Sequence, residues 1–140
     1  MKSVDSVDIE LSVSFELEQL LSFNDITCDP NRMHVDPECA QSFGYPSAVV
    51  NGALASSTAV GLTYKSFGLP NGSLLLGVES SFHLPLFAGV CYMLRVTLLR
   101  SFLGGTILEF KCSYLEETSP STVLQVHKLT TKLSAPYNET

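Results

Sequence analysis

The sequence predicts an α+β domain in which an antiparallel sheet wraps around one buried helix. Three observations lead to this fold class: an alternating segment near the N-terminus, an almost uncharged helix in the middle, and a series of strands separated by turns in the second half. The 140 residues are enough for one hydrophobic core. We therefore expect a single domain over residues 1–140, with its core over about 8–133 and a loose tail over 134–140.

The first strand is predicted over residues 7–13, where valine, isoleucine and leucine alternate with aspartate, glutamate and serine. Between residues 15 and 23 the apolar positions recur at helical spacing instead, which indicates a short helix that leads to Asp29. Pro30 disfavours a helical backbone at Asp29, so the chain leaves the helix there as a loop.

The loop over residues 29–36 gathers carboxylates, an amide and an imidazole. The run Asp36-Pro37-Glu38 after it is typical of a helix start, with Asp36 as the N-cap and proline at the first helical position. A loop held in place by a helix start is a natural position for a functional site. An Asp-Pro-Asn run is also a common turn, so spacing alone leaves both interpretations open. His34 has no second histidine at ligand spacing, so we expect no metal site.

The most distinctive helix is predicted from Ala53 to about Ser66. It has almost no polar face, which indicates a buried helix, and its small residues permit close approach of a sheet. Asn51 is a good N-cap, so the amide of Gly52 should point outwards at the positive end of the helix dipole. The remaining strands are predicted over residues 73–83, 90–102, 106–116 and 122–133.

Composition excludes several classes of protein. The chain is 45% hydrophobic and 16% charged, which excludes disorder, and its net charge of −6 disfavours nucleic acid as a partner. Polar residues interrupt the uncharged run over residues 39–64, so we expect no membrane span. The four cysteines form no C-x-x-C pair and the N-terminus is too polar for a secretory signal, so we expect mostly buried, reduced thiols and a cytoplasmic location. His127 is expected to face solvent.

The motif Asp29-x-Asn31-x-x-His34-x-Asp36 resembles the hydratase signature of the MaoC-like hot-dog proteins, the (R)-specific enoyl-CoA hydratases. The similarity covers roughly residues 8–133. Further matches follow in the family's order: Ala40, Gly44-Tyr45, residues 50–54 and residues 76–89. The resemblance implies a hot-dog fold. The chain departs from the family at Asn51, where a histidine is common.

The resemblance also implies a reaction, the hydration of a trans-2-enoyl thioester or the reverse dehydration, without a cofactor. Asp29 would act as the base, His34 would share the water and help to pass a proton to C2, and Asn31 would orient the water. The N–H group of Gly52 would stabilise the thioester oxygen. The substrate would be an acyl thioester of coenzyme A or of an acyl carrier protein, and the expected substrate-binding residues are Tyr45, Asn51, Leu54, Thr58 and Lys65. Domains of this family and length generally pair, so we expect a homodimer.

Two other functions are compatible with such a fold. A hot-dog thioesterase usually has an acidic residue on the central helix, and residues 53–64 contain none. A non-catalytic acyl-thioester binding or assembly subunit needs no Asp/His pair, whereas this chain has Asp29 and His34. Both alternatives remain open until activity is measured.

Overall fold

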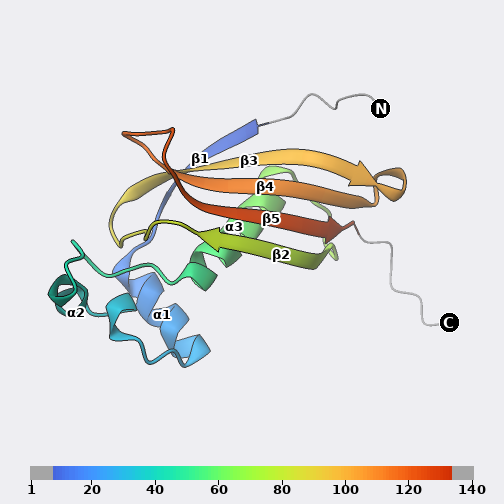
Figure 1. The fold of residues 1–140 in the computed structure, drawn as a ribbon. Helices are drawn as coiled ribbons and strands as arrows, with labels where there is room; N and C mark the ends of the chain where they lie inside the picture. Colours follow the sequence, from blue (N-terminus) through green and yellow to red (C-terminus); the bar gives the residue numbers. More distant parts are fainter. Residues whose placement is uncertain (1–7, 134–140) are drawn as a thin grey trace.

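A computed structural model describes residues 8–133 of the chain, and the tail expected over 134–140 lies outside them. Five antiparallel strands form one sheet in the order β1-β3-β4-β5-β2 (Figure 1). The strands are β1 (Asp8–Ser14), β2 (Leu74–Phe82), β3 (Cys91–Phe102), β4 (Ile107–Glu116) and β5 (Val123–Lys132). The helices are α1 (Leu17–Thr27), α2 (Pro37–Ser42) and α3 (Gly52–Ser66), with the short 3-10 helices η1 (Arg32–His34) and η2 (Leu103–Gly105).

Helix α3 lies along one face of the sheet, and α1 and α2 lie together beyond one end of it (Figure 1). The predicted fold class is confirmed, and the strand boundaries agree with the predicted ones to within a few residues. Helix α1 extends further than predicted, because it ends only at Cys28, which takes a left-handed conformation with φ of 58°. Within residues 8–133, no helix is long and apolar enough to cross a bilayer.

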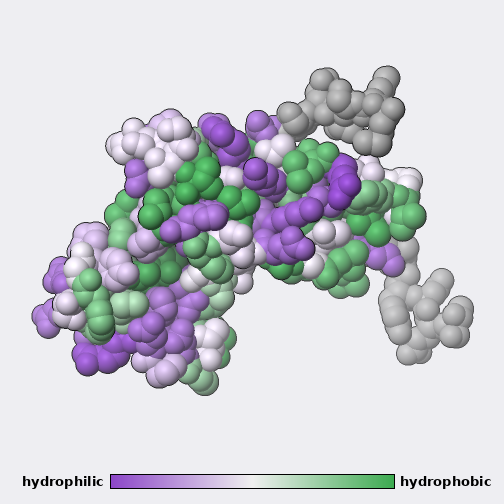
Figure 2. All heavy atoms as spheres, viewed as in Figure 1, coloured by the Kyte–Doolittle hydropathy of each residue, from purple (hydrophilic) through white to green (hydrophobic). Residues whose placement is uncertain are grey.

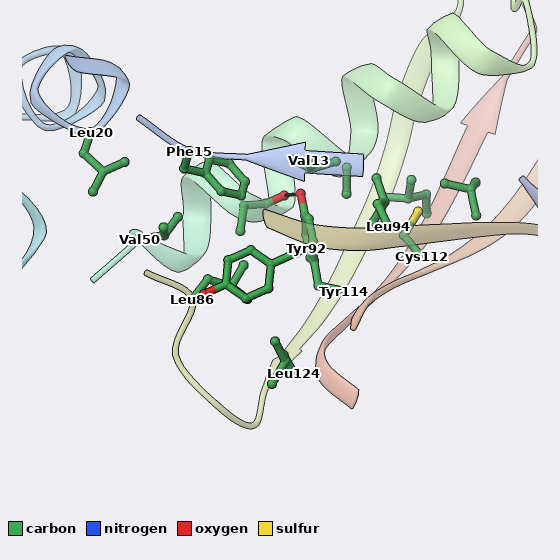
Figure 3. Packing of buried hydrophobic residues seen from close by; sticks show 14 of the residues in the cluster. Val13, Phe15, Leu20, Val50, Leu86, Tyr92, Leu94, Cys112, Tyr114 and Leu124 are labelled. Carbon is green, nitrogen blue, oxygen red and sulfur yellow. Dashed lines mark hydrogen bonds between the residues drawn. The ribbon is translucent and has the colours of Figure 1, made fainter. Parts of the chain in front are cut away.

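Small residues of α3 pack against the sheet. Ala55 and Ala59 are fully buried, and the hydroxyl of Tyr114 donates a hydrogen bond of 2.8 Å to the carbonyl of Ala55. Aromatic and aliphatic side chains from the strands, from α1 and from the segment before α3 complete the core (Figure 3). Helix α3 packs against the sheet as predicted, but one side of it is not covered in the single chain. One stripe of the helix is exposed, and it consists of Ala53, Ser57, Gly61 and Lys65.

Strand β2 forms an edge of the sheet and pairs only with β5 among the described strands. Its large apolar side chains are unusually exposed, from 37% for Val78 to 62% for Leu74. Hydrophobic residues also reach the surface on both sides of a central hydrophilic group in Figure 2. An exposed apolar edge strand is a ready template for pairing with another chain.

His127 is fully buried on β5, which corrects the expectation that it faces solvent. Its Nδ1 lies 2.7 Å from the hydroxyl of Ser80, which in turn lies 2.9 Å from the hydroxyl of Ser56 on α3. The ring is packed between the rings of Phe82 and Tyr114. Burial lowers the pKa of His127 to about 4. Its Nε2 has no partner in the described part of the chain, so a proton there would be poorly solvated.

All four cysteines are free thiols. The expectation that most of them are buried is wrong, because only Cys112 is buried, while Cys28 and Cys91 are exposed. Burial raises the pKa of the Cys112 thiol to about 11. The exposed cysteines lie at the ends of elements: Cys28 follows the last residue of α1, and Cys91 is the first residue of β3.

Candidate active site

The backbone of Asp29 is fixed by the end of α1. Asn24, on the last turn but one of that helix, is buried, and its side-chain amide donates to the carbonyl of Asp29 at 3.3 Å. The N–H of Asp29 donates in return to the carbonyl of Asn24 at 3.1 Å. The left-handed conformation of Cys28 turns the chain between the two residues. Sequence reasoning did not single out Asn24, because the contact depends on that turn.

Two donors hold the carboxylate of Asp29. Its Oδ1 accepts the backbone N–H of Asn31 at 2.9 Å, which closes a tight turn around Pro30. Its Oδ2 accepts a hydrogen bond of 2.9 Å from the side-chain amide of Asn51. The side chain of Asp29 is 28% exposed, so a small molecule can reach it.

His34 ends η1, and its ring faces Asp29. The imidazole Nδ1 lies 2.7 Å from the backbone carbonyl of Val49. Because a carbonyl only accepts, Nδ1 carries the proton and Nε2 of the neutral ring is an acceptor. Nε2 lies 4.0 Å from Oδ2 of Asp29, and only 14% of the His34 side chain is exposed. The backbone N–H of Val49 also donates to the carbonyl of Met33 at 2.9 Å, so this segment anchors η1.

The start of α3 lies next to this pair. Asn51 is the N-cap, as predicted, and its Oδ1 accepts the N–H of Ala53 at 2.9 Å. The N–H of Gly52, the first helical residue, has no hydrogen-bond partner among residues 8–133. A free amide at a helix N-terminus favours a negatively charged oxygen. A Cβ atom on Gly52 would lie only 2.8 Å from the ring of Phe82, so a larger residue here would require that half-exposed ring to move.

Asp36 is a structural residue of the loop. Its Oδ1 accepts the N–H groups of Glu38 and Cys39, which caps α2 as predicted. Its Oδ2 accepts a hydrogen bond of 2.6 Å from the guanidinium of Arg32. The hydrogen bond from Arg32 lowers the pKa of Asp36 below its usual value, with help from the two backbone donors. Asp36 therefore remains a carboxylate and fixes the loop on both sides of His34.

The structure brings together Asp29, His34, Asn51 and Gly52, with Asn31 beside them on the turn. The side-chain oxygen of Asn31 caps η1 by accepting the N–H of Met33 at 3.1 Å. Among the residues 8–133, no group of three or more histidine, cysteine, aspartate or glutamate side chains could hold a metal ion.

The other residues expected to bind substrate are spread over a wider area. Leu54 borders a surface groove next to the outer face of α1. The hydroxyl of Thr58 bonds to the carbonyl of Leu54 within the helix, at 2.8 Å. Tyr45 packs its ring against Phe87. Lys65 lies near the C-terminal end of α3, about 20 Å along the helix from Gly52, and its role in substrate binding stays a prediction.

Comparison with known proteins identifies the MaoC-like domain that the sequence motif resembles. The family model described as "MaoC like domain" matches residues 3–99. The (R)-specific enoyl-CoA hydratase of Aeromonas caviae is 36% identical over 93 residues, which cover 64% of this chain and 68% of that protein. The family-model match therefore covers the candidate site and α3.

Solved structures show the fold over nearly the whole chain. The A. caviae (R)-hydratase involved in PHA biosynthesis matches with a TM-score of 0.80, covering 92% of this chain and 96% of that one at 23% identity over this longer alignment. R-hydratase PhaJ1 of Pseudomonas aeruginosa matches with a TM-score of 0.76 and 16% identity, covering 96% and 88%. The HadBC (3R-hydroxyacyl-ACP dehydratase) complex of Mycobacterium tuberculosis matches with a TM-score of 0.76 and 14% identity, covering 90% and 95%.

Proposed function

The chain belongs to the family of MaoC-like domains, and from this premise we propose that it hydrates trans-2-enoyl thioesters to (R)-3-hydroxyacyl thioesters or catalyses the reverse dehydration. The observation that carries the proposal is the pair of proton acceptors, Asp29 Oδ2 and His34 Nε2, held 4.0 Å apart at the start of α3, where the N–H of Gly52 has no hydrogen-bond partner among residues 8–133. The acyl group is carried as a thioester of coenzyme A or of an acyl carrier protein.

The 4.0 Å separation suits one water molecule that donates one O–H group to Asp29 and the other to His34. Two acceptors of the same water lie about 4–4.5 Å apart when each hydrogen bond is about 2.8 Å long. The lone pairs of such a water point away from both acceptors, towards the bound substrate. Two N–H donors hold the carboxylate of Asp29, and the carbonyl of Val49 holds the ring of His34. The two side chains are therefore already in position when the substrate binds.

In the proposed reaction the water oxygen attacks C3 of the enoyl group while Asp29 takes one of its protons. The electrons of the C2–C3 double bond move towards the thioester carbonyl, whose oxygen becomes an enolate oxygen. The N–H of Gly52 donates to that oxygen, and the helix dipole of α3 adds to the stabilisation. The Asp29–His34 pair then returns the proton to C2. The net change is the addition of H and OH across the double bond, and the protein regains its starting protonation state.

The first test follows the loss of the conjugated enoyl absorbance when purified protein is added to crotonyl-CoA and, in parallel, to the same acyl group on a carrier protein. The product configuration is then determined with a dehydrogenase that accepts only the (R)-3-hydroxyacyl ester. We expect (R) product. Release of free thiol, detected with a thiol reagent, would instead identify a thioesterase. An acyl thioester that binds but stays unchanged would identify a non-catalytic binding subunit.

The proposed location is a reducing compartment such as the cytoplasm, which the free cysteines of the chain suit.

The proposed assembly is a homodimer formed through β2. The exposed apolar side chains of this edge strand support the dimer. Leu76→Lys should convert the dimer to a monomer in light scattering after size-exclusion chromatography. Leu103→Lys is the matched control, because Leu103 is 75% exposed but lies outside β2. A wild-type protein that is monomeric at high concentration would contradict the dimer.

A further inference from the structure

We propose that Asn51 is a positioning residue that holds the carboxylate of Asp29 at the N-terminus of α3. This inference rests on the proposed function, in which Asp29 and the N–H of Gly52 must act on one substrate. The two groups come from segments more than 20 residues apart, and one side chain joins them.

Both ends of the Asn51 amide are used. Its Nδ2 donates to Asp29 Oδ2 at 2.9 Å, and its Oδ1 accepts the N–H of Ala53 at 2.9 Å. The orientation of the amide is unambiguous. Turning it over would bring its oxygen against a carboxylate and its NH₂ group against a backbone N–H, and both contacts would be repulsive. The side chain is half-buried, so solvent does not easily replace these bonds.

The hydrogen bond from Asn51 Nδ2 to Asp29 Oδ2, which we call the joint, restricts the carboxylate that faces His34. Oδ1 of Asp29 is held by the N–H of Asn31, and Oδ2 is held by Asn51, so rotation of the carboxylate breaks at least one bond. Without the Nδ2 donor, Oδ2 is free to move relative to His34 Nε2, and the 4.0 Å separation that suits a water is no longer enforced. A displacement of about 1 Å in a catalytic group can cost about 100-fold in rate.

Two substitutions separate this role from simple helix capping. Asn51→Ser and Asn51→Asp both keep an oxygen that caps α3 well, and both remove the Nδ2 donor to Asp29, because aspartate has no N–H group and the serine hydroxyl lies one bond closer to the backbone than Nδ2. We expect kcat on crotonyl-CoA to fall about 10- to 100-fold in each, with KM changed by less than about threefold. In Asn51→Asp the new carboxylate repels Asp29, so the acid limb of the kcat/KM profile should also move to higher pH.

Wild-type kcat in both variants would overturn the proposal. A change confined to KM would also overturn it, because Asn51 would then be a substrate-binding residue.

A second measurement does not depend on activity. Urea unfolding of wild type, Asp29→Ala, Asn51→Ser and the double variant gives a double-mutant cycle for the contact. The proposal predicts that the shifts in unfolding midpoint are not additive. If the cycle is non-additive and the wild type does not hydrate enoyl thioesters, the joint stands and the proposed function fails. If the wild type is active and the cycle is additive, the joint itself is refuted.

Discussion

Replacing His127 with glutamine should make the fold less sensitive to acid. His127 is fully buried, and burial lowers its pKa from an ordinary value of about 6.5 to about 4. The unfolded chain therefore takes up a proton as the pH falls through 6.5, whereas the folded chain takes it up only near pH 4. The contribution of His127 to stability is fully present above pH 6.5 and is lost as the pH falls from 6.5 towards 4.

The size of the effect follows from the difference in pKa. Each pKa unit corresponds to about 1.4 kcal/mol, so the complete loss is about 3 kcal/mol. Between pH 7.5 and pH 5 the same relation gives a loss of about 2 kcal/mol. That is a large fraction of the free energy of unfolding of a typical domain.

Urea unfolding at pH 7.5 and pH 5, at one protein concentration, measures this loss. Wild type should lose about 2 kcal/mol more between the two pH values than His127→Gln does. The comparison holds even if the variant is less stable at both pH values, because only the pH-dependent part is used. His83→Gln, which removes an exposed histidine, controls for the loss of a histidine elsewhere. An equal loss in wild type and His127→Gln would refute the reasoning.

Three further predictions concern packing and thiol reactivity. Gly52→Ala should cost at most about 1 kcal/mol in urea unfolding, because its Cβ meets the Phe82 ring, which is half exposed and can shift, and adding Phe82→Leu should recover the loss. Tyr114→Phe removes a buried hydrogen bond to α3 and should cost about 1 kcal/mol in the same assay. Iodoacetamide at about pH 8 should alkylate exposed Cys28 and leave Cys112 unmodified until the protein unfolds, as peptide mass spectrometry can show.

The parts of the structure that the sequence predicted well depend on local chemistry. Pro30 and the Asp36 cap act within a few residues of themselves, so the loop between α1 and α2 and its boundaries follow from sequence spacing. The Asn51 cap is predictable for the same reason. The strands were predictable because alternation and turn residues are also local signals.

The parts that were missed depend on contacts between distant segments. The bond between Asn51 and Asp29 forms only when the start of α3 is packed beside the end of α1. The polarity of His127 predicts a solvent-facing side chain, but its face of the strand is buried, as Leu129, two residues further along on the same face, also shows.

The most direct test of the central claim is the effect of Asp29→Asn and His34→Gln on kcat/KM for crotonyl-CoA. Asp29→Asn keeps the shape of the side chain and His34→Gln keeps a polar side chain of similar length, and each removes a proton acceptor that faces the water position. We expect each to lower kcat/KM by about 100- to 10,000-fold. Asp25→Asn, on the exposed side of α1, and His83→Gln should stay within about twofold of wild type. Wild-type activity in either Asp29→Asn or His34→Gln would contradict the account.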